Sequence, residues 1–147
     1  MVVNIGLLGF GTVGQGLAHI LNNKSEATPL KDINIKKILV RNLEKERKVK
    51  VSKDKLTLNP QEIMEDKEID IIVEVTGDVD LSYRLVKEAL NNKKHVVTAN
   101  KALVSKHFEE LSLLAEENDV YFLYEASVAG GIPILKNLKD QIRVNNI

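Results

Sequence analysis

Near its start, the chain joins a short apolar run, a glycine-rich turn and a helical pattern. Val2–Leu8 has the length of a strand, Gly9-Phe10-Gly11-Thr12-Val13-Gly14 follows it, and apolar residues then recur at helical spacing at positions 13, 17, 20 and 21. A Gly-x-Gly-x-x-Gly sequence alone is a weak signal. A strand, glycine turn and helix in this order are typical of a dinucleotide-binding unit, which constrains the rest of the fold.

Each glycine of the turn has an expected task. Gly9 permits the tight turn, Gly11 lets the backbone approach a pyrophosphate, and Gly14 lets the helix pack closely on the strand. The free N–H groups and positive dipole end of the new helix then bind phosphate. The alternative is a strand-to-helix turn that binds no ligand, which the full context makes the weaker interpretation.

Composition excludes several classes of protein. The chain has 147 residues, enough for one domain, and 21 basic residues balance 21 acidic ones, so nothing favours nucleic acid or an anionic membrane as a partner. The absence of cysteine excludes disulfides, thiolate catalysis and cysteine-bound metals. With no targeting segment and no apolar run of membrane-spanning length, we expect a soluble, cytoplasmic domain.

The rest of the chain alternates strand and helix patterns, which predicts an α/β fold with a doubly wound parallel sheet of the Rossmann type over residues 1–147. Asp80 and Ser105 precede apolar stripes at helical spacing and are the expected helix caps. Leu43–Asp66 is the least regular segment, with a solvated charge cluster at Glu44–Lys48 and one helical turn at Pro60–Met64. Further strands are expected at Ile33–Val40, Ile69–Val75, His95–Thr98 and Val120–Tyr124.

The end of the second strand bears on the choice of nucleotide. NAD-preferring domains usually place an acid there for the ribose hydroxyl, but this strand ends in Val40-Arg41-Asn42, and Asp32 lies before the strand at the wrong edge of the sheet. Arg41 can hold a 2′-phosphate, and no carboxylate is expected at that site to repel it. Lys53 and Lys55 could add a second cation. We therefore expect NADP rather than NAD, although Arg41 could also be a solvated strand end.

Two more segments follow strands at the ligand-binding edge of the sheet. Thr76-Gly77 follows the third expected strand and would let the nicotinamide half pass close to backbone. Thr98–Leu103 follows the fourth and places Lys101 in the crevice, where a lysine can hold a carboxylate, stabilise an alkoxide or exchange a proton. The alternative is a helix-start lysine that points to water.

The last distinctive segment is Tyr124–Ile134, which reads Tyr-Glu-Ala-Ser-Val-Ala-Gly-Gly-Ile-Pro-Ile. It leaves the fifth expected strand and is predicted to enter a helix through Gly130-Gly131, with Pro133 at the first helical position. Irregular backbone of this kind can turn carbonyl oxygens onto a cation.

The Gly9–Gly14 turn, Thr98-Ala99-Asn100-Lys101 and the segment from Tyr124 to Pro133 together resemble homoserine dehydrogenase, in the right order and over essentially the whole chain. The resemblance implies hydride transfer between L-homoserine and L-aspartate 4-semialdehyde with NAD(P)H, in the biosynthesis of threonine, methionine and isoleucine. It implies that Gly9–Gly14 (Gly9, Phe10, Gly11, Thr12, Val13, Gly14) bind the pyrophosphate and that Arg41 binds the 2′-phosphate.

The resemblance also implies that Thr76 and Gly77 line the path of the nicotinamide ribose. Lys101 would sit between nicotinamide and substrate as the catalytic lysine of this chain, taking part in substrate binding or proton transfer. Backbone carbonyls would hold a sodium ion, and these are the carbonyls of Glu125, Val128, Gly130 and Ile132.

Members of this family continue into a second domain that supplies the substrate pocket and the homodimer interface. We therefore expect that domain to be absent after Ile147, and the chain alone to bind NADP(H) with little turnover. A stand-alone nucleotide-sensing domain is the alternative, although it has no need of Lys101. Aspartate-semialdehyde dehydrogenase acts on the same aldehyde but requires a cysteine nucleophile, which this chain lacks.

Overall fold

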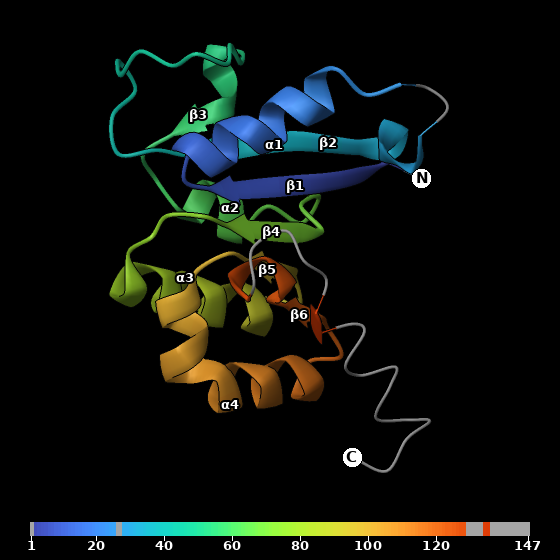
Figure 1. Cartoon of the computed structure of the whole chain (residues 1–147), viewed down its shortest axis with the longest axis vertical. Helices are drawn as coiled ribbons and strands as arrows, with labels where there is room; N and C mark the ends of the chain where they lie inside the picture. The colour runs from blue at the N-terminus through green and yellow to red at the C-terminus, as the bar shows by residue number, and fades with distance from the viewer. Residues whose placement is uncertain (1, 26–27, 129–133, 136–147) are drawn as a thin grey trace.

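The computed structural model describes residues 2–25, 28–128 and 134–135, and its centre is a six-stranded sheet in which all pairs are parallel (Figure 1). The order across the sheet is β3-β2-β1-β4-β5-β6. The strands are β1 Val3–Leu8, β2 Ile33–Leu39, β3 Leu56–Thr57, β4 Ile71–Glu74, β5 His95–Thr98 and β6 Phe122–Leu123.

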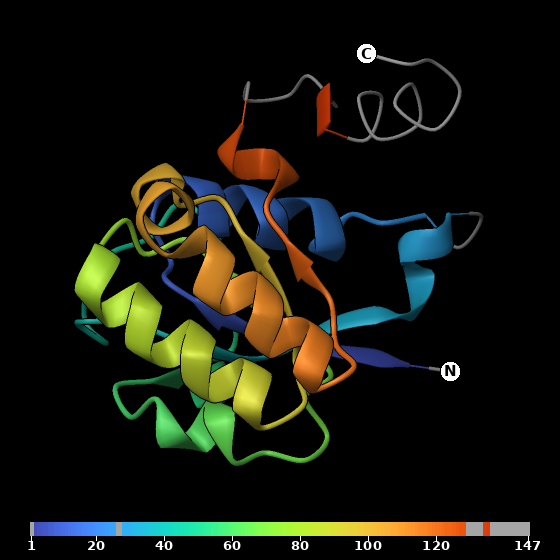
Figure 2. The ribbon, with the colours of Figure 1, turned by 90° about the horizontal axis from the view of Figure 1, so that it is seen from below.

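Helices cover both faces of the sheet, as the α/β prediction requires. They are α1 Thr12–Asn22, α2 Gln61–Met64, α3 Val79–Asn91 and α4 Lys101–Glu117. Figure 2 shows α1 on one side of the strands and α3 and α4 on the other.

Side chains of β1 alternate between the two cores because successive residues of a strand point to opposite faces. Ile5 and Leu7 pack in the core that contains Ala18 of α1. Leu8 packs in the opposite core, together with Leu85 of α3 and further residues of α2 and α4. The predicted doubly wound fold is thereby confirmed.

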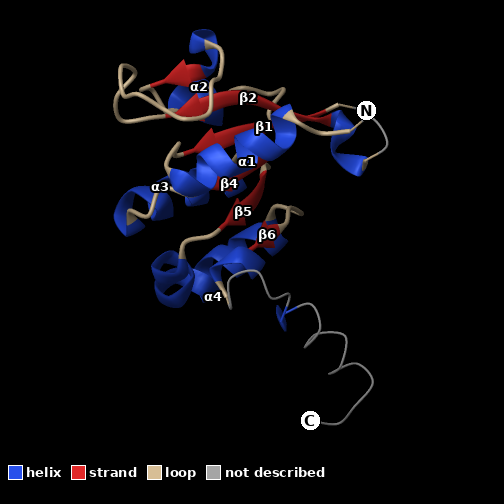
Figure 3. Ribbon diagram, turned by 45° about the horizontal axis from the view of Figure 1, so that its top comes forward, coloured by secondary structure: helices blue, strands red, loops and turns tan. Residues whose placement is uncertain are grey.

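The sheet also fixes where a ligand can bind. From β1 the chain passes to β2 and β3 on one side, and then crosses to β4, β5 and β6 on the other (Figure 3). The strand order therefore reverses between β1 and β4, and in open parallel sheets ligands bind at the carboxyl ends of the strands beside such a reversal.

The five strands expected from the sequence are all present, with ends that differ by up to two residues. The two-residue strand β3 was not expected. The predicted helical turn is α2, and Pro60 is its N-cap rather than its first residue.

Two predicted helix caps were wrong. Asp78, not Asp80, caps α3 by accepting a hydrogen bond from the Leu81 N–H, and Asn100, not Ser105, caps α4. In α3 the first buried residue is Ser82, which follows exposed or partly buried positions, whereas in α4 Leu103 is already buried before Ser105, so the apolar stripes did not mark the true helix starts. Over the described part of the chain, none of the helices combines the length and the apolar character that a membrane span requires.

Candidate functional site

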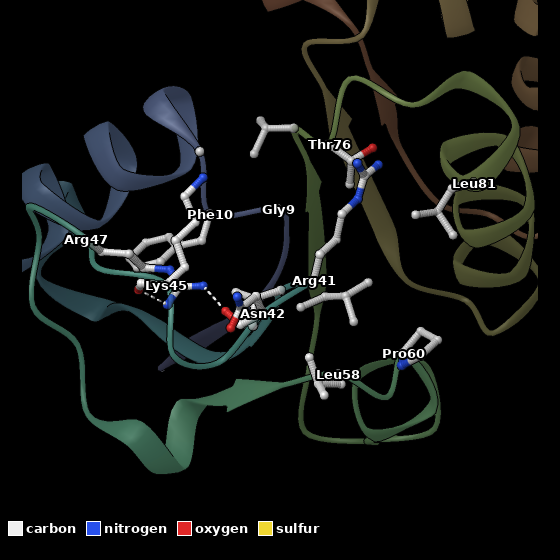
Figure 4. A pocket seen from close by; sticks show the side chains of 14 residues that line it. Gly9, Phe10, Arg41, Asn42, Lys45, Arg47, Leu58, Pro60, Thr76 and Leu81 are labelled. Carbon is white, nitrogen blue, oxygen red and sulfur yellow. Dashed lines mark hydrogen bonds between the residues drawn. The ribbon is translucent and has the colours of Figure 1, made fainter.

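A pocket of about 550 Å³ lies at the carboxyl ends of β1, β2 and β4. Its wall combines the glycine turn, the end of β2, the loop that follows β2 and the start of the β4–α3 connection, and Figure 4 shows these residues. The lining residues are Gly9, Phe10, Gly11, Leu39, Val40, Arg41, Asn42, Lys45, Arg47, Leu58, Pro60, Val75, Thr76 and Leu81.

The glycine turn is built by close backbone approaches. Gly9 has a φ of +102°, which disfavours other residues, and a Cβ there would lie 3.0 Å from the carbonyl oxygen of Val75. A Cβ on Gly14 would lie 2.4 Å from the carbonyl oxygen of Gly9. These two glycines therefore have the turn-forming and close-packing tasks that the sequence predicted.

Gly11 differs, because a Cβ there would meet nothing within 4 Å. Gly11 is the N-cap of α1, no side chain caps this helix end, and no acidic residue occupies its first turn. The helix start thus presents backbone N–H groups and a positive dipole end beside open space. This geometry fits a phosphate group.

Arg41 reaches across the pocket to an acidic partner, although most of its side chain is exposed. Its Nη2 atom lies 3.1 Å from Oδ2 of Asp78, and Figure 4 shows the side chain extended toward Thr76. The expectation that no carboxylate lies at this site was therefore wrong. Asp78 was missed because it belongs to the β4–α3 connection, which the fold brings to the end of β2.

The loop after β2 contributes two more cations, Lys45 and Arg47. Arg47 was predicted to lie in a solvated charge cluster, but it is half-buried, with its guanidinium 5.7 Å from the centre of the Phe10 ring. It donates to the carbonyl oxygens of Asn42 (2.6 Å) and Lys45 (2.8 Å). Among the described residues, its buried Nε finds no hydrogen-bond partner.

Gln15 of α1 fixes the same loop from the other side. Its side-chain oxygen accepts hydrogen bonds from the N–H groups of Lys48 (2.8 Å) and Val49 (3.2 Å). The loop that carries Lys45 and Arg47 is therefore tied to the glycine turn and to α1. What distinguishes Arg47 from the charged residues next to it in the sequence is its contact with Phe10. That contact joins distant parts of the chain, so nothing in the sequence indicated it.

The other basic residues and the acid considered from the sequence lie elsewhere. Lys55 donates to the carbonyl oxygen of Ile35 (2.7 Å), and neither Lys53 nor Lys55 lines the pocket. Asp32 ends a 3₁₀ turn, Pro29–Asp32, directly before β2, at the amino end of the strand as predicted.

Thr76 and Gly77 stand at the edge of the pocket above a buried carboxylate. Glu74, which is fully buried, accepts hydrogen bonds from Thr76 N (2.8 Å) and Thr76 Oγ1 (2.9 Å). It also accepts from Ser82 Oγ and Thr98 Oγ1, each at 2.6 Å. Gly77 has a φ of +76°, so its backbone conformation favours glycine even though a Cβ would meet nothing.

Lys101 is the first residue of α4, exposed at the carboxyl end of β5 and outside the set that lines the pocket. Asn100 beside it is buried, and its side chain donates to Ser82 Oγ (3.2 Å), which joins it to the hydroxyl groups around Glu74. The structure thus places Lys101 at the expected edge of the sheet without bringing it to the pocket residues.

Of the predicted cation ligands, only Glu125 and Val128 lie within the described residues. Glu125 opens the 3₁₀ turn Glu125–Ser127, and its carbonyl oxygen already accepts a hydrogen bond from Val128 N (3.1 Å). Gly130, Ile132 and the helix start predicted at Pro133 lie outside the described residues. Within the described ranges, no cluster of three or more acidic or histidine side chains could hold a metal.

Comparison with known proteins agrees with this geometry. Residues 9–125 match the family model described as "Homoserine dehydrogenase, NAD binding domain". A homoserine dehydrogenase of Synechocystis is 43% identical over 148 aligned positions. The alignment covers 100% of this chain and 34% of that protein. The chain therefore spans about a third of the length of the curated relatives that it matches.

Solved structures give the same result. The crystal structure of a homoserine dehydrogenase from Thiobacillus denitrificans is 38% identical, with a TM-score of 0.87 over 99% of this chain and 34% of that one. A hyperthermophilic archaeal homoserine dehydrogenase in complex with NADPH is 30% identical, with a TM-score of 0.75 over 94% of this chain and 48% of that one. The family model and the relatives together show that the chain belongs to the homoserine dehydrogenases and forms their nicotinamide-dinucleotide-binding domain.

Proposed function

We propose that the chain binds NADP(H) in this pocket, in preference to NAD(H), as the cofactor-binding part of a homoserine dehydrogenase. The observation that carries the proposal is the placement of three cations, Arg41, Lys45 and Arg47, around a pocket that also contains the uncapped start of α1. Phosphate groups are the ligands that helix starts and arginine clusters bind best.

Each part of the nucleotide has a matching part of the pocket. The turn Gly9–Gly14 binds the pyrophosphate, and the open space at Gly11 supports this assignment. Arg41 binds the 2′-phosphate, with Lys45 as a further cation. The apolar wall binds the adenine, and it is formed by Leu39, Val40, Leu58, Pro60 and Leu81.

The nicotinamide ring supplies or accepts the hydride that interconverts L-homoserine and L-aspartate 4-semialdehyde. Thr76 and Gly77 line the path of the nicotinamide ribose, supported by their place at the carboxyl end of β4 and by the rigid hydrogen bonds of Thr76 to Glu74. Lys101 binds the substrate or transfers its proton. Its exposure at the carboxyl end of β5 keeps it accessible to a substrate.

The substrate pocket and the homodimer interface belong to a second domain that this stretch does not include. In support, the chain covers 34% of the length of the Synechocystis relative. Without a pocket to enclose and orient the substrate, most of the positioning advantage is lost. The 147-residue chain alone therefore binds the cofactor with negligible turnover.

Sodium is the second cofactor that we propose, held by the carbonyl oxygens of Glu125, Val128, Gly130 and Ile132. The Glu125 carbonyl, which already accepts one hydrogen bond, would use its second lone pair for the cation. Sodium chloride should then stabilise the chain against heat more than choline chloride at equal ionic strength. Equal stabilisation by the two salts would exclude this site from the isolated chain.

The cofactor assignment is tested by a fluorescence titration of the chain with NADPH and NADH in parallel at the same low salt. We expect both to bind and NADPH to bind more tightly, by about tenfold or more if Arg41 contacts the 2′-phosphate in a charge-assisted pair. Equal binding would remove the NADP preference and leave the dinucleotide site. An assay with homoserine and NADP that showed ordinary turnover would contradict the need for a second domain.

A further inference from the structure

An ion pair spans the pocket from the end of β2 to the start of α3. Arg41 Nη2 lies 3.1 Å from Asp78 Oδ2, and the side chains are 75% and 43% exposed. Exposed pairs of this kind add little to stability. The position of the ion pair is more informative, because the pair occupies Arg41, the residue that we propose binds the 2′-phosphate.

The two partners differ in how firmly they are held. The Oδ1 atom of Asp78 accepts the capping hydrogen bond from Leu81 N (3.1 Å), and the Asp78 N–H donates to Thr76 Oγ1 (3.2 Å). Thr76 is in turn fixed by the buried Glu74. Among the described residues, the Arg41 guanidinium has Asp78 as its only hydrogen-bond partner. The acid is therefore the fixed member of the pair and the arginine the movable one.

We propose that Asp78 is a specificity-determining residue that restrains the preference for NADP by competing with the 2′-phosphate for Arg41. The inference rests on the proposed contact between Arg41 and that phosphate. To bind NADPH, Arg41 must either turn away from Asp78 or contact both the carboxylate and the 2′-phosphate. In addition, the negative carboxylate of Asp78 repels the phosphate. NADH has no phosphate at this position, so it binds while the pair stays intact. Asp78 thereby keeps the affinities for the two cofactors closer together than Arg41 alone would.

The substitution Asp78→Asn separates the two tasks of this side chain. Asparagine keeps the size and the oxygen that caps α3, and it removes the charge that holds Arg41. In titrations of the 147-residue chain at low salt, NADPH should bind about two- to fivefold more tightly, the range that an exposed ion pair spans, while NADH affinity changes less than about twofold.

Asp80→Asn is the matched control. Asp80 lies in the first turn of the same helix and is exposed, so this variant removes one charge near the same helix start without releasing Arg41. It should leave the NADPH-to-NADH affinity ratio unchanged. Thermal melts of all variants verify that each one folds.

The double variant Arg41→Ala/Asp78→Asn identifies the route of the effect. We expect Asp78→Asn to raise the affinity ratio in the native background and to raise it much less once Arg41 is removed, because only the repulsion between the carboxylate and the phosphate is then relieved. An unchanged ratio in the native background, or the same increase without Arg41, would overturn the competition. The single variant Arg41→Ala tests the underlying assignment: if it weakens NADPH but not NADH, the proposed function stands whatever Asp78→Asn does. If it weakens neither, the assignment and the competition both fall.

Discussion

Gly11 and Gly14 belong to one turn but are glycine for different physical reasons. A Cβ on Gly14 would lie 2.4 Å from the carbonyl oxygen of Gly9, which belongs to the backbone and cannot turn aside. A Cβ on Gly11 would meet nothing within 4 Å, and its φ of −81° is open to any residue. The fold therefore requires glycine at position 14, whereas at position 11 the space is open and the fold itself does not require glycine.

This difference predicts opposite outcomes for two alanine substitutions. Gly14→Ala should lower the free energy of unfolding by about 1–3 kcal/mol, as overpacking does. Gly11→Ala should change it by less than about 0.5 kcal/mol, because a less flexible unfolded chain offsets a poorer N-cap. Gly11→Ala should nevertheless weaken NADPH binding by about tenfold or more, since the methyl group occupies the path of the pyrophosphate. Urea denaturation and fluorescence titration measure the two quantities.

Gly16→Ala provides the control within the same helix. Gly16 lies in the interior of α1, is exposed, and a Cβ there would meet nothing within 4 Å. Its replacement should stabilise the chain by about 0.5–1 kcal/mol through helix propensity and leave NADPH affinity unchanged. If Gly11→Ala bound NADPH as tightly as Gly16→Ala does, this result would show that the pyrophosphate does not bind next to Gly11.

Among the elements, β4, β5 and α3 meet around the buried carboxyl group of Glu74. Thr76 follows β4, Ser82 lies in α3 and Thr98 ends β5, and all three donate hydrogen bonds to Glu74. No lysine or arginine among the described residues pairs with this carboxyl group. Hydroxyl and amide donors alone therefore satisfy the hydrogen-bonding capacity of the Glu74 carboxyl group. Through these hydrogen bonds Glu74 connects the Thr76 loop to the start of α4.

Glu74→Ala should lower the free energy of unfolding by about 3 kcal/mol or more, because it opens a cavity and leaves buried donors without an acceptor. Glu74→Gln keeps the shape and one acceptor oxygen, so the loss should be smaller, about 1–2 kcal/mol. Urea denaturation with Glu109→Ala as the control measures both, because Glu109 is exposed on α4 and its loss should cost less than about 0.5 kcal/mol. A loss from Glu74→Ala no larger than that of the control would show that the donors find other partners.

These elements also show what a sequence can predict. Strands β1 and β4 are largely apolar and β2 is rich in isoleucine, so composition alone identifies them. The strand Leu56–Thr57 has two residues and no such signature, and its pairing with β2 depends on the rest of the sheet. In the site, the glycine turn was predictable because the positive φ of Gly9 and the close approach of Gly14 to the Gly9 carbonyl both arise within one short segment. The contacts of Asp78 with Arg41 and of Arg47 with Phe10 join segments far apart in the chain, and spacing carries no information about them.

Across the whole molecule, the two ends of the sheet have separate tasks. The pocket lies at the carboxyl ends of the strands. Near the amino end of β4, Lys36 of β2 forms an ion pair with Asp66, with Nζ 2.7 Å from Oδ2, and a second one with Glu68. Lys94, which is buried, donates to the carbonyl oxygens of Asp66 and Ile69. These contacts stabilise the sheet without touching any residue that lines the pocket.

The ion pair shifts the pKa of both partners. Partial burial alone would raise the pKa of Asp66, but hydrogen bonds from Lys36 and from the Glu68 N–H, with the charges of Lys36 and Lys94, outweigh it and lower the pKa below the ordinary 3.8. Hydrogen bonds to Asp66 and Glu68 raise the pKa of Lys36 above 10.5. The stabilisation by Asp66 is therefore present above about pH 4 and is lost as the pH falls through its lowered pKa. That of Lys36 is present below about pH 10 and is lost at more alkaline pH.

Asp66→Asn should therefore destabilise the chain at pH 7, and destabilise it less as the pH falls below about 4 toward the lowered pKa of Asp66. Urea denaturation from pH 3 to 7 measures the difference, which should grow as the pH rises through the acidic range and then stay constant. At pH 7, NADPH affinity should be unchanged, because the substitution lies at the opposite end of the sheet from the pocket. A constant difference across this pH range would mean that the Asp66 charge contributes nothing, and a weaker NADPH complex would mean that the two ends of the sheet are coupled.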